Sequence, residues 1–163
     1  MVMRTIERAL APLRRRLRLL VTRGVIRRVD DAAGLQRVQL TALAGETLDG
    51  VERIQTYGLT SFPHPQADCV ILNVGASRSH PIIIAADDRR YRLHLQAGEV
   101  ALYDDLGQVV RLGRGGIVIE APQGLTINGD AVINGVLSNN GVNLTTHRHA
   151  GVQTGGGVTA GPQ

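Results

Sequence analysis

Residues 24–43 of this chain read GVIRRVDDAAGLQRVQLTAL, which predicts two β-strands joined by a turn. In the second half, the apolar Val38, Leu40 and Ala42 alternate with polar residues, as expected of a half-buried strand. The Asp31-Ala-Ala-Gly34 segment supplies the turn residues. A strand pair of this kind opens a small antiparallel sheet, so further strands are expected after it.

Three more strands are predicted on the C-terminal side. Residues 51–59 alternate less cleanly, whereas residues 69–74 and 81–86 are nearly continuous apolar runs, typical of strands covered on both faces. Pro63 and Pro65 mark a loop between the third and fourth strands. Five short strands within about 60 residues predict a small barrel, of which the OB-fold is the common five-stranded kind.

The N-terminal residues 4–22 have helical periodicity. A heptad seam is formed by Ile6, Leu10, Leu13, Leu17 and Leu20. Pro12 is expected to kink or restart this helix, and Gly24 to stop it. The helix packs on its own domain or forms a self-association seam. A nucleic-acid arm is less favoured, because it would leave the leucine face bare.

Charge is distributed unevenly along the 163 residues. All 18 basic residues are Arg, and nine lie in residues 1–28 with Glu7 as the only acid, so this segment carries +8 and the remainder −4. An arginine-rich end is typical of contact with nucleic acid, an acidic membrane surface or a protein. Aromatic residues make up 2% of the chain, so the core must consist of Val, Ile and Leu.

Residues 91–136 contain a repeat of short strands. The strands are expected to begin at Tyr91, Glu99, Gln108, Gly116 and Gly124. Strands this short cannot bury a face alone, so they favour a β-solenoid or a winding together of several copies. The alternative is a plain antiparallel meander next to the barrel.

No catalytic constellation is recognisable, which predicts that the chain is not an enzyme. Asp104 and Asp105 are interpreted as part of a hairpin turn, and Asp87 and Asp88 as part of a solvated ion-pair cluster. Cys69 is expected to be a buried small hydrophobe.

A nucleic-acid-binding OB module with a basic N-terminal arm is the alternative function. Such sites stack bases on aromatic side chains. Residues 24–86 contain only Tyr57 and Phe62, and their net charge is −1, so this alternative is disfavoured.

His147 and His149 are the candidate metal ligands. At positions i and i+2 of an extended chain, both imidazoles point to one side. Two imidazoles do not complete a metal shell, but three chains around an axis supply six nitrogens. That octahedral set suits Fe(II), Co(II) or Ni(II) and disfavours tetrahedral Zn(II). Read alone, residues 150–163 are typical of a flexible glycine-rich tail.

Three blocks, Val51–Ser61, Ser79–Arg92 and Gly98–Gly107, resemble in order the Mu-type phage baseplate assembly protein V family. These proteins are the central tail spikes of contractile-tailed phages and related bacteriocins. The ending THRHAG at residues 146–151, followed by three glycines at 155–157, is similar to the tip of that family.

The resemblance implies a mostly β fold and a structural virion protein of the tail baseplate, made in the host cytoplasm. The implied parts are an N-terminal amphipathic helix at 1–23, an OB-fold collar at 24–88, an intertwined trimeric β-helix shaft at 89–143 and an apex at 144–163. It also implies one iron ion per trimer on His147 and His149. The implied partners are two further copies, tail hub and baseplate proteins contacted through the collar and the N-terminal helix, and transiently the host outer membrane; neither nucleic acid nor a small-molecule substrate is expected.

Overall fold

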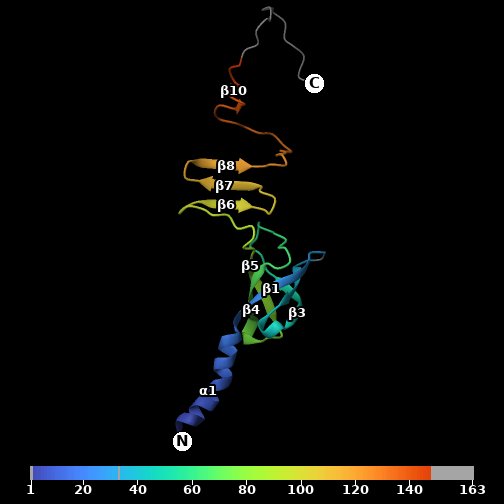
Figure 1. Ribbon diagram of the computed structural model, residues 1–163, viewed down its shortest axis with the longest axis vertical. Coiled ribbons are helices and arrows are strands. Elements are labelled where there is room, and N and C mark those ends of the chain that lie inside the picture. The colour runs from blue at the N-terminus through green and yellow to red at the C-terminus, as the bar shows by residue number, and fades with distance from the viewer. Residues whose placement is uncertain (1, 33, 148–163) are drawn as a thin grey trace, which may run out of the picture. The chain divides into compact units, whose positions relative to one another are not determined.

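The computed structural model describes residues 2–32 and 34–147, which form a mostly β structure with one N-terminal helix (Figure 1). The elements are α1 Val2–Leu19, β1 Val21–Asp30, β2 Gln36–Thr41, β3 Thr47–Arg53, β4 Asp68–Asn73, β5 Pro81–Asp87, β6 Val100–Tyr103, β7 Val109–Gly113, β8 Gly116–Glu120, β9 Ser138–Asn139 and β10 Val142–Asn143, with short 3-10 helices at Leu43–Gly45 and Val74–Ala76. The chain divides into two compact units between Pro122 and Gln123.

Strands β1 to β5 close into a barrel in the order β1-β2-β3-β5-β4 (Figure 1). All neighbours are antiparallel except β3 and β5, which pair in parallel through Glu52 opposite Ile82 and Arg53 opposite Ile83. The short β3–β5 pairing closes the barrel. The five-stranded barrel expected from the sequence is therefore confirmed.

Branched aliphatic side chains fill the barrel. The buried core consists of Ile26, Val38, Leu40, Val51, Ala67, Cys69, Ile71 and Ile83. Each fully buried Val, Leu or Ile stabilises the fold by about 1.5–3 kcal/mol relative to an exposed one. Cys69 is buried as predicted, and burial raises the pKa of its thiol.

The sequence predicted that Gly24 stops the helix, and this is wrong. Gly24 lies inside β1, opposite Cys69 of β4. A Cβ atom at Gly24 would lie 3.0 Å from the Cδ1 atoms of both Leu40 and Ile71. The glycine therefore allows β1 to approach the core side chains of two neighbouring strands.

The end of α1 is determined by a residue far away in the sequence. Asn73 at the end of β4 donates its side-chain amide to the carbonyl of Leu19 and its backbone N–H to the carbonyl of Leu20, the latter at 2.8 Å. Unsatisfied carbonyls at a helix end need such partners. The helix consequently ends at Leu19 rather than at residue 22, and it continues through Pro12.

Strand β3 begins earlier and ends earlier than the predicted 51–59. The Ile54 N–H still donates to the Ile83 carbonyl of β5 at 2.9 Å. After Ile54 the chain leaves the barrel in a turn, with the Leu59 N–H donating to the Thr56 carbonyl at 3.0 Å and Gly58 at a φ of +84°. Positive φ values favour glycine, and the sequence alternation gave no sign of this turn.

Strands β6, β7 and β8 form an antiparallel three-stranded sheet (Figure 1). Within one chain this is the meander that the sequence left as an alternative. The strands expected from Tyr91 and Gly124 do not form in the described part of the chain. The Tyr91 N–H is used in a local turn to the carbonyl of Asp88, and Gly124 adopts a φ of +94°, which interrupts an extended run.

The second unit contains a small hairpin of β9 and β10. Asn140 and Gly141 connect the strands with φ values of +49° and +80°. Two consecutive positive φ values are characteristic of a tight hairpin turn, for which Asn-Gly is the preferred pair. The turn predicted at Asn139-Asn140-Gly141 is thus confirmed.

Candidate functional site

The β6–β8 sheet has one entirely apolar face. In one row across the sheet, Val100 lies opposite Leu112, which lies opposite Ile117. In a second row, Leu102 lies opposite Val110, which lies opposite Ile119. The face, called the apolar face below, comprises Val100, Leu102, Val110, Leu112, Ile117 and Ile119. Five of these six side chains are exposed, Ile117 by 69%.

The opposite face of the same sheet is mixed. It carries Ala101, Tyr103, Val109, Arg111, Val118 and Glu120. Contiguous exposed apolar surface marks a site of association, whereas isolated exposed apolar residues do not. The apolar face is therefore the strongest candidate for an assembly surface on this sheet.

Of the two histidines predicted to bind metal, the structure describes His147; His149 lies outside the described residues. The Nδ1 atom of His147 lies 2.9 Å from the carbonyl of Leu144. Because a carbonyl only accepts, Nδ1 must donate, and the neutral ring then carries its lone pair on Nε2. Metal-binding histidines commonly make this backbone contact with the other ring nitrogen. The contact therefore orients the ring of His147, and the metal site on His147 and His149 stays a prediction.

A group of at least three His, Cys, Asp or Glu side chains placed to hold a metal ion is not found within residues 2–32 and 34–147. Among the same residues, no helix is both long and apolar enough to cross a membrane.

The part of the seam that lies in α1 is exposed, whereas Leu20, the last seam residue, follows α1 and is half-buried. Ile6, Leu10, Leu13 and Leu17 are all exposed on the surface of the single chain. The alternative that this seam packs on the chain's own barrel is therefore not realised. An apolar stripe bordered by arginines is left for another surface.

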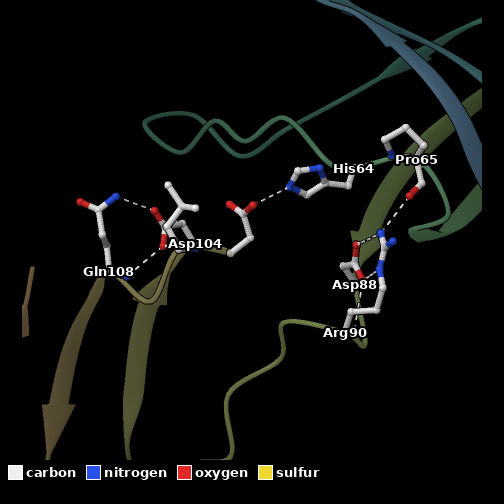
Figure 2. Close-up of polar contacts among 8 residues, drawn as sticks. His64, Pro65, Asp88, Arg90, Asp104 and Gln108 are labelled. Carbon is white, nitrogen blue, oxygen red and sulfur yellow. Dashed lines mark hydrogen bonds and ion pairs between the residues drawn. The ribbon is translucent and has the colours of Figure 1, made fainter. Parts of the chain in front are cut away.

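Sequence reasoning assigned no role to His64, yet the structure joins it to a distant turn. Its Nε2 lies 3.0 Å from Oδ2 of Asp105, so the loop before β4 contacts the turn between β6 and β7 (Figure 2). Asp104 closes that turn by accepting hydrogen bonds from the N–H groups of Leu106 and Gln108, each at 2.9 Å. The hairpin turn predicted at Asp104 and Asp105 is confirmed, and its second carboxylate forms a contact across 41 residues of sequence.

Arg90 contacts the loop before β4 at Pro65, the residue that follows His64 (Figure 2). Its guanidinium pairs with Asp88 and donates to the carbonyl of Pro65 at 2.8 Å. The hydrogen bond from Arg90 holds the pKa of Asp88 below its ordinary value. Arg89 and Arg92 pair with further carboxylates on the surface, so the predicted ion-pair cluster is confirmed.

A family model and individual relatives both match this chain, and they indicate one family. A family model described as Bacteriophage Mu Gp45, N-terminal, matches residues 23–90, the barrel. The chain is similar to the baseplate puncturing device gp45 of Escherichia phage Mu, with 39% identity over 112 residues that cover 68% of this chain and 57% of that protein. It is also similar to the Mu-like prophage FluMu protein gp45 of Haemophilus influenzae, with 38% identity over 131 residues that cover 80% of this chain and 71% of that protein.

The chain thus spans little more than half the length of the phage Mu relative. The name of that relative describes a structural device of the baseplate, in agreement with the prediction that this chain is not an enzyme.

Proposed function

The chain belongs to the bacteriophage Mu Gp45 family, as its sequence blocks predicted, and on this premise we propose that it is the trimeric central spike of a contractile-tail baseplate. It resides in the virion at the tail baseplate after synthesis in the host cytoplasm. When the sheath contracts, the spike is driven through the host outer membrane. Its work is mechanical, and no covalent bond is broken.

The observation that carries this proposal is the apolar face of the β6–β8 sheet. A single chain leaves these branched side chains in water and leaves β6 and β8 as open edges. Three interwound copies remove both defects, because each apolar face turns to the common axis and each edge strand gains a neighbour. The result is an intertwined β-helix narrow enough for a spike.

The tip is proposed to be closed by one iron ion shared by three chains. Each chain contributes the imidazoles of His147 and His149, so that six nitrogens surround the threefold axis. The contact from Nδ1 of His147 to the Leu144 carbonyl supports this assignment, since it directs the lone pair to Nε2. The ion would tie the three chain ends together at the point.

The other end is proposed to dock on the tail hub and on neighbouring baseplate proteins through α1 and the barrel. The exposed seam of Ile6, Leu10, Leu13 and Leu17 supplies the apolar contact. If α1 formed a homomeric coil instead, Arg14 and Arg16 would flank the seam without acidic partners at matching positions. A partner surface that carries carboxylates fits this helix better than a second copy.

Complementation of a tail-producing strain that lacks this gene tests the proposal. Full-length protein should restore axial density at the end of the baseplate, seen by electron cryomicroscopy, together with killing of sensitive cells. A variant without residues 1–23 should still trimerise but should fail to join baseplates. Tails that are complete and active without the chain would refute the spike function, and active tails with the truncated variant would refute the docking role of α1.

A further inference from the structure

The loop that follows β3 presents apolar side chains to solvent. Within residues 54–62, called the 54–62 loop below, Ile54, Leu59 and Phe62 are exposed, and Tyr57 is fully exposed. Tyrosine and other large side chains on a defined surface are typical anchors of protein interfaces. The barrel core does not need these residues, because its strands are already closed and filled.

Hydrogen bonds hold the 54–62 loop in one conformation. The Gln55 side chain accepts from the Ser61 N–H at 2.8 Å and donates to the Thr60 hydroxyl at 3.2 Å. The Arg53 guanidinium donates from Nη1 to the Ser61 carbonyl and from Nη2 to the Ser61 hydroxyl, each at 2.8 Å. A loop ordered in advance binds a partner with a smaller entropic loss than a flexible one.

Arg53 is a buried cation without an ion-pair partner among the described residues. The residue is 8% exposed, and Nη1 also donates to Oε1 of Gln36 at 2.7 Å. Burial lowers the pKa of Arg53, and Asp31 opposes this only through a longer-range attraction. Within residues 2–32 and 34–147, no carboxylate lies within ion-pair distance of its guanidinium. Nε and one N–H of Nη2 make no hydrogen bond in that part of the chain.

A pocket of about 360 Å³ lies between Arg53 and the 54–62 loop. Ile54, Leu59 and Ile84 supply apolar walls, and the remaining lining residues are small or polar and include no acid. A guanidinium recognises a carboxylate through paired N–H donors, and such charge-assisted bonds strengthen where water is excluded. Apolar walls around one arginine fit an acidic side chain on a protein better than a nucleic-acid backbone, which requires an extended basic surface.

We propose that this pocket receives an Asp or Glu side chain of a different baseplate protein, with Arg53 as its counter-charge and Tyr57 as the apolar anchor beside it. The proposal rests on the proposed function and specifies how the barrel docks. In the proposed trimer, copies of this chain contact one another through the apolar face of the β6–β8 sheet. The pocket lies on the barrel, in a different segment of the chain, and we therefore assign its occupant to a different protein.

Site-specific crosslinking in assembled tails tests the occupant. Tyr57→p-benzoyl-phenylalanine in the full-length chain should crosslink, on illumination, to another baseplate protein next to an Asp or Glu, as identified by mass spectrometry. Crosslinks only to other copies of this chain would overturn the proposal. So would the absence of crosslinks in tails that contain the substituted protein.

A charge variant supplies the second test. Thr56→Glu places a carboxylate on the pocket wall, where it competes for Arg53, and should reduce incorporation into tails at least tenfold without changing the trimer mass or lowering the melting temperature. Thr47→Glu adds the same charge at an exposed barrel position outside the pocket and should be incorporated like wild type. Incorporation of Thr56→Glu at the wild-type level would refute the pocket assignment alone, whereas absence of the wild-type protein from tails would refute the baseplate function.

Discussion

The barrel and the β6–β8 sheet are built from the same kind of side chain but treat it in opposite ways. Ile26, Ile71 and Ile83 are 0% exposed inside the barrel, whereas Ile117 and Ile119 on the sheet are 69% and 54% exposed. The barrel closes on itself and fills its own interior. The sheet leaves its apolar face exposed in the single chain, and under the proposed function other chains cover that face. Fold stability and assembly therefore reside in different segments, and substitutions can separate them.

The largest expected effect is on assembly. Ile117→Asp should abolish trimers, because three carboxylates would meet in a dry interior, where each unpaired charge costs several kcal/mol. The barrel should remain folded, so that the circular dichroism spectrum of the variant stays close to that of the wild type. Sedimentation measures the change in mass.

The adjacent residue provides a matched control. Val118 is exposed on the mixed face of β8, and Val118→Asp introduces the same charge one position along the strand. This variant should assemble nearly as well as wild type. Equal loss of trimers in both variants would show that the apolar face has no special role.

The second largest effect is on the stability of the barrel, with assembly unchanged. Gly24→Ala places a Cβ atom 3.0 Å from the Thr41 carbonyl and from two core methyl groups. Overpacking of this kind costs about 1–3 kcal/mol. Chemical denaturation should therefore show a lower unfolding midpoint for the barrel, while the subunit stoichiometry of the folded protein stays unchanged. An unchanged midpoint would show that β1 can shift away from its neighbours without cost.

A smaller effect on assembly is expected at the tip. His147→Ala combined with His149→Ala should remove the metal, which elemental analysis measures, and leave the trimer intact because the shaft already holds the chains together. Full metal content in the double variant would refute the assignment of these ligands.

The smallest effect concerns the surface ion pair beside β5. The pKa of Asp88 is lowered in the folded protein, so its contribution to stability is present above the ordinary carboxyl pKa near 4 and is lost as pH falls through the lower folded value. Melting temperatures measured from pH 6 down to pH 2 should fall less steeply for Asp88→Asn than for wild type. Glu120→Gln, which removes an exposed carboxylate without an ion pair among the described residues, should leave the slope unchanged.

Local pattern predicted much of the barrel, because alternation and turn residues are encoded over a few positions. All five barrel strands were located, although the predicted range of β3, 51–59, lies toward the C-terminus of the observed Thr47–Arg53. The end of α1 was missed because it depends on Asn73, and the role of Gly24 was missed because it depends on Leu40 and Ile71. Such contacts exist only once the strands are in register.

The candidate surfaces were predictable to different degrees. The apolar pairs of the repeat were visible in the sequence, whereas their gathering on one face depends on the register of β6, β7 and β8. The pairing of His64 with Asp105 and the network around Arg53 could not be foreseen, since each joins residues from separate loops or strands. The metal site on His147 and His149 remains a prediction from spacing and resemblance.

Native mass spectrometry of the full-length protein, with elemental analysis of the same sample, measures directly whether three copies assemble and share one metal ion. We expect a single species at three times the 17.4 kDa chain mass, persisting at low micromolar concentration and carrying one metal ion per three chains. A folded monomer at that concentration, with the apolar face of the β6–β8 sheet still exposed, would contradict this expectation.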